Sequence, residues 1–210
     1  MEIIEKYFSG FDAHQQKQIA ALKELYEDWN AKINVISRKD IENFYEHHVL
    51  HSLAIATQFE FLPGNMVMDL GCCGGFPGIP LAIFFPETNF LMVDSINKKL
   101  KVVKEVADAI GLKNIETRHT RAEDIKDKKF DTVVSRAVAP LKELWFWSRP
   151  LIQKNQSTKG KNVPKGLICL KGGDLSTEIH ESGLRPFVWE INQVFKEPHF
   201  DQKYMLYVPK

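Results

Sequence analysis

Apolar residues recur along the first sixty positions at the spacing of a helix. Ile19, Leu22, Tyr26, Trp29 and Ile33 follow one another at alternating steps of three and four, with charged residues between them. This is the pattern of an amphipathic helix with one buried face. Because it lasts for only two heptads, we expect the segment to cover a flank of a larger body and not to form an exposed coiled coil.

A Pro-Gly pair at positions 63 and 64 marks a boundary, and the pattern changes after it. Short apolar runs of strand length now alternate with stretches of helical spacing. The strand-like runs are residues 66–70, 90–93, 132–134 and 167–170, and the helical stretches are residues 79–85, 98–110 and 141–152. This alternation predicts a parallel sheet with crossover helices, with residues 1–62 as an N-terminal helical lobe and residues 63–210 as the main domain.

The end of the chain breaks the alternation. Residues 188–195 and 204–208 have the pattern of two strands, and only a short turn around Pro198 separates them. A parallel pair needs a connection of about a dozen residues or more, usually a helix, so these two strands are predicted to be antiparallel. The predicted fold class is therefore α/β, with a doubly wound sheet that ends in an antiparallel hairpin.

The composition is that of an ordinary globular protein. The 210 residues are 44% hydrophobic and 26% charged, which excludes a wholly disordered or fibrous chain. The longest apolar run, residues 79–85, is far too short to cross a bilayer. Glu2 and Glu5 stand where a secretory signal carries positive charge, and no apolar segment follows them. We therefore expect a cytoplasmic protein without a membrane partner.

Charge is distributed unevenly along the chain. Residues 1–62 hold six Lys/Arg against ten Asp/Glu, a net charge of −4, whereas residues 63–210 hold 22 against 17, a net charge of +5. No acidic residue lies between Glu143 and Asp174. That stretch includes a polar, Lys-rich loop at 153–165, and its cations are Arg149, Lys154, Lys159, Lys161, Lys165 and Lys171. It is the segment best suited to a polyanionic partner.

The most informative motif lies in residues 66–78. An apolar strand ends at Asp69 and Leu70, and four glycines follow, at positions 71, 74, 75 and 78. In a doubly wound sheet this first turn faces the ligand crevice at the carboxyl ends of the strands. Glycines there let the backbone approach a ligand and adopt positive φ. We therefore expect a ligand that contains a nucleotide.

The spacing of the glycines argues against a dinucleotide. That fingerprint is Gly-x-Gly-x-x-Gly, but Cys73 stands where the second glycine should be. Asp69 suits a cationic amino-acid group, as in the methionine part of S-adenosylmethionine. Asp94, at the end of the next strand, can accept hydrogen bonds from both ribose hydroxyls of either cofactor. The motif alone thus leaves a nicotinamide-dependent oxidoreductase as a disfavoured alternative.

Five short motifs, in order along the chain, narrow the interpretation. They are Asp69-Leu70-Gly71 with Gly75-Phe76-Pro77-Gly78-Ile79-Pro80-Leu81, Asp94-Ser95 with Lys98-Lys99, Arg121-Ala122-Glu123, Ser135-Arg136-Ala137 and Leu170-Lys171-Gly172. Together they resemble the 16S ribosomal RNA guanine-N7 methyltransferase G family, also called glucose-inhibited division protein B. The resemblance extends from Trp29-Asn30 to the C-terminal hairpin. It implies a seven-stranded class I methyltransferase-like sheet and S-adenosylmethionine-dependent methylation of one guanine of 16S RNA, conventionally number 527.

The resemblance also assigns roles to single residues. Together with Asp69, the cofactor site would contain Gly71, Phe76, Asp94, Ser95, Ile96, Ala122, Glu123 and Arg136. Arg136 and Lys171 are expected to support catalysis. The residues that the resemblance assigns to RNA binding are Arg121, Lys171 and Lys203; the family usually has arginine at the last of these. Lys165, from the acid-free stretch, is also expected to bind RNA. The expected partner is 16S ribosomal RNA or the small ribosomal subunit, and the chain is expected to be a monomer.

Two positions depart from the family pattern. The family usually has glycine where this chain has Cys73, and a left-handed backbone there would cost a residue with a Cβ roughly 1–2 kcal/mol. The family's His-x-x-Asp-Ser is His48-Val49-Leu50-His51-Ser52 here, so an acid has become His51. The alternative function, a catalytically weakened ribosome-assembly factor that binds RNA, rests on Cys73.

The implied reaction needs no catalytic base. Guanine N7 has an in-plane lone pair and no proton, so its methylation leaves nothing to deprotonate. We therefore expect residues that hold N7, the methyl group and the sulfur in line, without a metal or a covalent intermediate.

Two groups of residues have a plain interpretation and a functional one. His47 and His51 share a helical face, but no carboxylate-bearing zinc motif or cysteine pair accompanies them. A surface or RNA-facing role is therefore favoured over metal binding. Trp145, Phe146 and Trp147 could stack on bases, but they lie on a crossover helix, where packing against the sheet is favoured.

Overall fold

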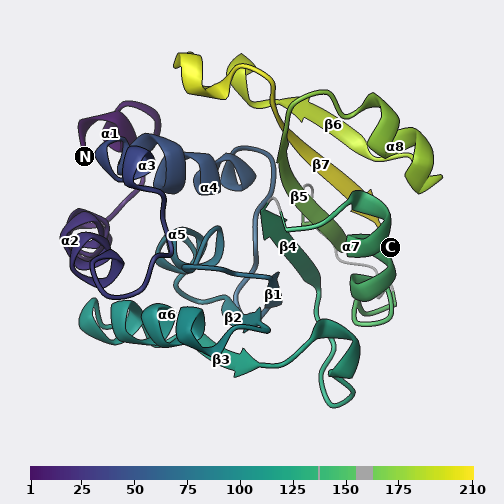
Figure 1. Cartoon of the computed structure of the whole chain (residues 1–210), viewed down its shortest axis with the longest axis horizontal. Coiled ribbons are helices and arrows are strands. Elements are labelled where there is room, and N and C mark those ends of the chain that lie inside the picture. The colour runs from purple at the N-terminus through teal and green to yellow at the C-terminus, as the bar shows by residue number, and fades with distance from the viewer. Residues whose placement is uncertain (137, 155–162) are drawn as a thin grey trace.

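The computed structural model describes residues 1–136, 138–154 and 163–210. Its strands form one sheet in the order β3-β2-β1-β4-β5-β7-β6 (Figure 1). They are β1 Met66–Leu70, β2 Asn89–Asp94, β3 Ile115–His119, β4 Thr132–Arg136, β5 Gly166–Gly172, β6 Phe187–Glu190 and β7 Lys203–Pro209. Pairs from β3 to β5 are parallel, whereas β7 is antiparallel to both β5 and β6. The predicted fold class is confirmed.

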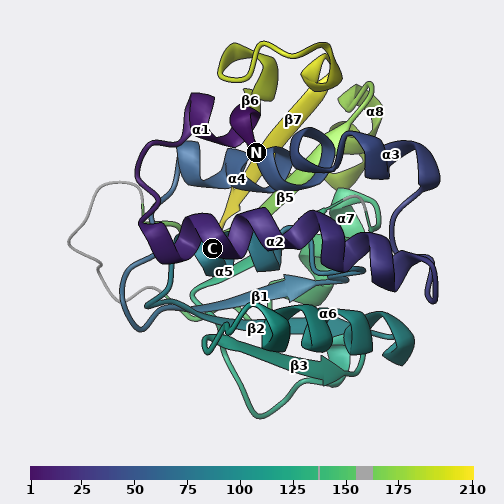
Figure 2. The ribbon, with the colours of Figure 1, turned by 90° about the vertical axis from the view of Figure 1, so that its left-hand side faces the viewer.

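Helices cover both faces of this sheet (Figures 1 and 2). The N-terminal helices lie with α5 and α6 on one side, and α7 and α8 lie on the other. The α-helices are α1 Glu2–Tyr7, α2 Ala13–Asn30, α3 Arg38–Glu42, α4 His51–Leu53, α5 Gly78–Phe84, α6 Asn97–Ala109, α7 Leu141–Ser148 and α8 Ser176–Ser182. A π-helix, η1, spans Tyr45–Leu50, and 3-10 turns are η2 Ala54–Thr57, η3 Ala122–Asp124, η4 Ile191–Gln193 and η5 Pro198–Phe200. None of the described helices is long and apolar enough to cross a membrane.

The two layers of helices explain the nearly continuous apolar strands. Successive side chains of a strand point to opposite faces of the sheet. Val67 accordingly joins the core on the side of α2, α5 and α6, and Met68 joins the core on the side of α7. Strands buried on both faces have apolar residues at consecutive positions instead of alternate ones.

The N-terminal segment docks through its predicted stripe. Helix α2 begins with a capping box between Asp12 and Gln15, which satisfies two backbone N–H groups that otherwise lack partners. Ile19, Leu22 and Tyr26 on this helix are fully buried in the core that also contains α5 and α6. Residues 1–62 thus form one face of the common core.

Elements missing from the sequence-based prediction lie mainly at the surface. Strand β3 is an edge strand with no buried residue, and α8 has none either. Neither therefore has an apolar pattern. The last helix of the parallel part was predicted too long: α7 ends at Ser148, because Pro150 has no backbone N–H to continue the helical hydrogen bonds. The strand predicted at 188–195 was also too long, because β6 ends at Glu190 and the chain turns into η4.

Candidate cofactor site and RNA-facing edge

Hydrogen bonds to the end of β2 hold the glycine turn after β1. The backbone N–H groups of Gly71 and Cys72 donate to the carbonyl oxygen of Val93, at 2.9 and 3.0 Å. Gly71 has a φ of +67°, and a Cβ at this position would lie 2.7 Å from the methyl groups of Val138, so glycine is needed here. Cys73 has a φ of +54°. The left-handed backbone considered for this position is therefore present.

Asp94 ends β2 and anchors the same turn. Its Oδ2 accepts a hydrogen bond from the backbone N–H of Cys73 at 2.9 Å, and its Oδ1 accepts one from that of Ile96 at 2.8 Å. The residue is only 7% exposed, yet it lines a cavity. Because a carboxylate oxygen has two acceptor sites, both oxygens can accept a further hydrogen bond from a ligand.

The cavity has a volume of about 440 Å³ and lies at the carboxyl ends of β1, β2 and β4. This volume is in the range of cofactor sites. Of the nine residues predicted to bind the cofactor, seven line the cavity, namely Gly71, Asp94, Ser95, Ile96, Ala122, Glu123 and Arg136. The structure therefore brings most of that set together from four different segments of the chain.

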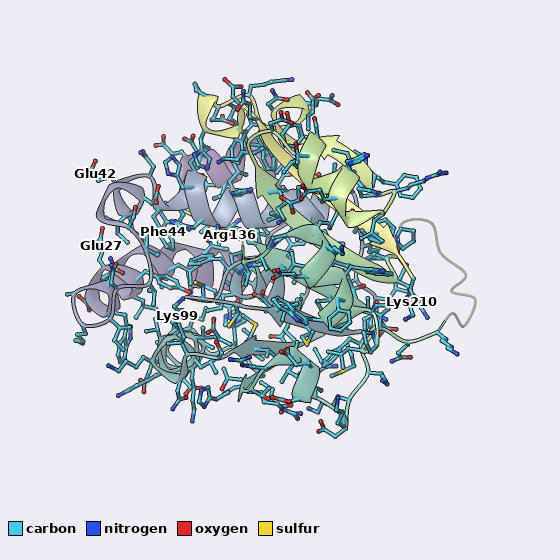
Figure 3. The ribbon with its side chains drawn as sticks, turned by 45° about the vertical axis from the view of Figure 1, so that its right-hand side comes forward. Glu27, Glu42, Phe44, Lys99, Arg136 and Lys210 are labelled. Carbon is cyan, nitrogen blue, oxygen red and sulfur yellow. The ribbon has the colours of Figure 1, made fainter. Side chains whose placement is uncertain are left out.

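Other residues of the cavity wall were not predicted. They are Leu70, Cys73, Val93, Lys99, Thr120, Val138 and Trp147. Arg121, which was predicted to bind RNA, lies at the same wall. Lys99, on α6, donates a hydrogen bond from Nζ to Sγ of Cys73 at 3.0 Å, and Figure 3 shows it below Arg136, which comes from β4. The Lys98-Lys99 motif was a sequence signal that could have identified Lys99, whereas no signal in the sequence pointed to Thr120 or Val138.

Asp69 and Phe76, the other two residues of the predicted set, do not line the cavity. Asp69 is fully buried and accepts a hydrogen bond from the backbone N–H of Gly78 at 2.8 Å, at the start of α5. Burial raises the pKa of this carboxyl to about 7. Phe76 packs between Tyr26 and Phe44, with ring centroids 4.9 and 5.9 Å away. Both residues therefore lie behind the wall and support it.

The guanidinium of Arg136 is fixed from several sides. Its carbon lies 5.0 Å from the ring centroid of Phe76. Its Nη2 donates to Nδ1 of His48 at 2.9 Å, and its Nη1 donates to the carbonyl oxygen of His47 at 3.3 Å. Burial and the charge of Arg136 lower the pKa of His48 to about 3. His48 is therefore neutral at physiological pH, and its Nδ1 can act as the acceptor.

Comparison with known proteins identifies the family of this chain. Residues 15–195 match the family described as rRNA small subunit methyltransferase G. The chain belongs to this family. The Ribosomal RNA small subunit methyltransferase G of Bacteroides thetaiotaomicron is 58% identical over 208 residues, which are 99% of this chain and 98% of that protein. The protein of the same name from Flavobacterium johnsoniae is 45% identical over 100% of this chain and 98% of its own length. The resemblance inferred from the motifs is confirmed.

Solved structures show the same fold at low sequence identity. A SAM dependent methyltransferase from Aquifex aeolicus has a TM-score of 0.53 at 16% identity and covers 82% of this chain and 98% of its own. Fibrillarin from Aeropyrum pernix, in complex with natively bound S-adenosyl-L-methionine, has a TM-score of 0.52 at 13% identity and covers 74% and 72%. The chain therefore has the fold of S-adenosylmethionine-dependent methyltransferases.

Lys171 has partners inside the protein. It is 8% exposed, and its Nζ lies 2.6 Å from Oε1 of Glu178 and donates to the carbonyl oxygen of Ala139. Glu178 also accepts a hydrogen bond from the backbone N–H of Leu141 at 2.6 Å. The Lys171–Glu178 pair thus fastens the connection between β4 and α7, which carries Val138 at the cavity wall.

The remaining predicted RNA-binding residues lie at opposite ends of the strands. Arg121 is exposed at the cavity wall, and Lys203 begins β7 opposite Gly172, at the same edge. Lys165 precedes β5 and is buried, with its Nζ 3.9 Å from Oδ1 of Asp131. Along β5 it lies about 20 Å from Lys171. Most of the Lys-rich loop, including Lys159 and Lys161, lies outside the described residues.

Three histidines of the N-terminal lobe, His47, His48 and His51, are packed and do not form a free surface cluster. His51 is 7% exposed and contacts the rings of His199 and Phe200, so the expectation of a surface position was wrong for this residue. Its Nε2 has no hydrogen-bond partner among the described residues. His47 stacks on His199, with ring centroids 3.7 Å apart, and its Nδ1 lies 2.9 Å from Oδ1 of Asp40. The substitution of an acid by His51 thus places a neutral imidazole in the core.

Proposed function

We propose that this chain methylates N7 of a single guanine in 16S ribosomal RNA, conventionally number 527, with S-adenosylmethionine as the methyl donor. The observation that carries the proposal is the match to the rRNA small subunit methyltransferase G family over residues 15–195, with relatives more than 50% identical along the whole chain. The cavity at the carboxyl ends of the strands would hold the cofactor.

The residues of the cavity wall fit this cofactor. Asp94 has acceptor sites left for the two ribose hydroxyls, Ile96 and Ala122 offer apolar surface to a purine, and Gly71 allows close approach at the methionine side. Cys73 is compatible with this arrangement because its backbone N–H still donates to Asp94 despite the positive φ. S-adenosylmethionine supplies a methyl group bonded to a sulfonium centre, and the positive charge of the sulfur makes the methyl carbon electrophilic.

The protein's own contribution is to position the RNA. Arg136 has five N–H donors, and the contacts with His48 and His47 occupy two of them, so the others can donate to the RNA at the mouth of the cavity. Arg121 and Lys203 would contact phosphates there. Lys171 would act indirectly, since Glu178 and the connection before α7 hold its ammonium group.

Calorimetric titration with S-adenosylhomocysteine, with NADH as the control, tests the cofactor without any assumption about the RNA. One-to-one binding of S-adenosylhomocysteine alone is expected. Transfer of labelled methyl groups to 16S RNA and to small subunits from cells that lack the modification, followed by nucleoside analysis for 7-methylguanosine, then tests the reaction. Binding of S-adenosylhomocysteine without transfer to either substrate would favour the assembly-factor alternative, and binding of NADH would contradict the proposed cofactor.

A further inference from the structure

A second basic surface lies away from the mouth of the cofactor cavity. We call it the α7 flank surface, and it consists of Lys126, Lys129, Phe146, Arg149, Lys154 and Lys210. These residues come from the segment after η3, from α7 and its end, and from the C-terminus, which Figure 1 shows on one side of the molecule. Figure 3 shows Lys210 well separated from Arg136.

Three of the five cations of this surface donate to backbone carbonyl groups and not to carboxylates. Nζ of Lys126 donates to the carbonyl oxygen of Glu123 at 2.6 Å, and Nζ of Lys129 donates to that of Pro150 at 2.7 Å. Nζ of Lys210 donates to the carbonyl oxygen of Arg149. Within the described part of the chain, none of the five cations has a carboxylate oxygen within 4.0 Å. The ammonium groups of Lys126, Lys129 and Lys210 are therefore oriented by the backbone, but their charges are not neutralised.

Like charges gather on this surface in spite of their repulsion. The pKa of Lys210 is lowered by burial and then by the nearby charges of Arg149, Lys154 and Lys129. Two of the neighbouring acids are already engaged, because Asp127 lies 2.7 Å from Arg118 and Asp131 lies 3.9 Å from Lys165. Glu123, Asp124 and Glu143 remain, the last on α7 one turn before Phe146. Against five cations, positive charge still predominates and favours a polyanion.

An exposed aromatic ring lies among these charges. Phe146 is 74% exposed, whereas Trp145 and Trp147 on either side are partly buried and pack on the core. Packing was thus the right interpretation for the tryptophans and the wrong one for Phe146. With Lys126, Lys129 and Pro150, Phe146 lines a hollow of about 300 Å³. A planar apolar face beside cations is the combination that binds unpaired nucleotides, through stacking of the base and contacts to the phosphates.

The hollow adjoins the cofactor cavity. Ala122, Glu123 and Trp147 line both of them. We propose that the α7 flank surface binds a segment of the substrate RNA other than the target loop, with an unpaired base stacked on Phe146 and phosphates on Lys126, Lys129, Arg149 and Lys210. The proposal rests on the proposed function, which supplies an RNA long enough to reach from the mouth of the cavity to this flank.

The test compares two kinds of variant by binding to unmodified 16S ribosomal RNA at several salt concentrations. F146A is expected to weaken binding roughly ten- to hundredfold at constant salt. K126Q/K129Q is expected to reduce the slope of log affinity against log salt by about 1 to 2, because each lost phosphate contact removes about 0.7 to 0.9. S-adenosylhomocysteine affinity, measured by calorimetry, should stay at the wild-type value in both, which also shows that they are folded.

Matched controls separate this surface from general charge and general exposed aromatic area. K17Q/K104Q removes the same charge from exposed lysines on α2 and α6, and F187A removes another exposed ring, on β6. Neither should change RNA binding. If F146A and K126Q/K129Q bind 16S RNA like these controls while the wild-type chain methylates it, the α7 flank surface does not bind RNA and the proposed function stands. If the wild-type chain neither binds nor methylates the RNA, the proposed function fails, and the assignment of this surface with it.

Discussion

At the scale of single residues, Asp94 is the group on which cofactor binding depends most directly. Both of its carboxylate oxygens accept backbone N–H groups of the loops that enclose the cavity. In asparagine an NH2 group replaces one of these oxygens, so that two hydrogen-bond donors would face each other. Asp94→Asn should therefore raise the Kd for S-adenosylhomocysteine at least about tenfold, or 1.4 kcal/mol, in a calorimetric titration. Asp108→Asn, at an exposed position of α6, is the control, and equal affinities in the two variants would contradict the assignment.

Lys171 allows a test of whether a basic residue acts on the RNA or on its own protein. Lys171→Met leaves Glu178 without its ionic partner, and Glu178 is 25% exposed. We expect a loss of about 2 kcal/mol in the free energy of unfolding, less than for a fully buried pair, in a urea titration. Lys171→Met/Glu178→Gln should recover part of this loss, because no carboxylate is then left unpaired.

The salt dependence of RNA binding distinguishes the two roles of Lys171. A residue that contacts a phosphate contributes about 0.7 to 0.9 to the slope of log affinity against log salt. If Lys171 acts only through the connection after β4, its replacement should lower methyl transfer and leave this slope unchanged. A decrease in the slope would instead show a direct contact with the RNA.

At the scale of elements, helix α2 supports the glycine turn from behind. The hydroxyl of Tyr26 donates to the carbonyl oxygen of Gly74 at 2.5 Å, within the core. Tyr26→Phe should cost about 1 kcal/mol of stability and weaken S-adenosylhomocysteine binding, because the turn loses a support. Tyr45→Phe removes another tyrosine hydrogen bond, which goes to the carbonyl oxygen of Ala20 on α2 at an exposed position and does not involve the turn. It should leave cofactor affinity unchanged, and a parallel effect of both variants on affinity would contradict a specific role of the hydrogen bond between Tyr26 and Gly74.

The contact between α4, η1 and η5 makes stability depend on pH. Burial lowers the pKa of His48 to about 3 and that of His199 to about 4, and it holds that of His51 well below 6.5. The unfolded chain therefore binds protons below about pH 6.5 that the folded chain does not, so stability falls as the pH falls through this range. Asp69 has the opposite effect, because its folded pKa of about 7 exceeds 3.8 and the folded chain binds that proton first.

His51→Leu tests this linkage. The substitution removes one buried imidazole whose Nε2 has no partner in the described part of the chain. The slope of unfolding free energy against pH between about 6.5 and 4.5 should decrease by roughly 1.4 kcal/mol per pH unit, the value for one proton. Urea titrations at a series of pH values provide the measurement, and an unchanged slope would mean that His51 is not the titrating group.

At the scale of the whole molecule, the two segments divided at Pro63 share one core. Ile19, Leu22 and Tyr26 of α2 are buried in the same cluster as residues of α5, α6 and the sheet. We therefore expect the full chain to unfold in one cooperative transition, with coincident fluorescence and circular dichroism curves. A fragment of residues 63–210 should not fold on its own, because it would expose one side of this cluster. Two separate transitions would show instead that the lobe is an independent domain.

The sequence by itself determined what depends on local pattern. The apolar strands, the glycine turn after Asp69 and the acid at Asp94 are short-range features, and parallel strands place their carboxyl ends at one edge of the sheet. The positions of Gly71 and Asp94 at the cavity wall could therefore be predicted from the pattern, whereas the family resemblance supplied Ser95, Ile96, Ala122, Glu123 and Arg136. Edge elements such as β3 and α8 could not, because without buried residues they have no apolar pattern.

Only the tertiary structure decided which charged and aromatic groups meet. Lys165 and Lys171 belong to one acid-free stretch, yet they lie at opposite ends of β5. Glu178 of α8 pairs with Lys171. His51 is buried by η5, from the far end of the chain, and Phe146 is exposed between two packed tryptophans. The partners of a charge and the burial of a ring depend on segments that are distant in sequence, and local periodicity contains no information about them.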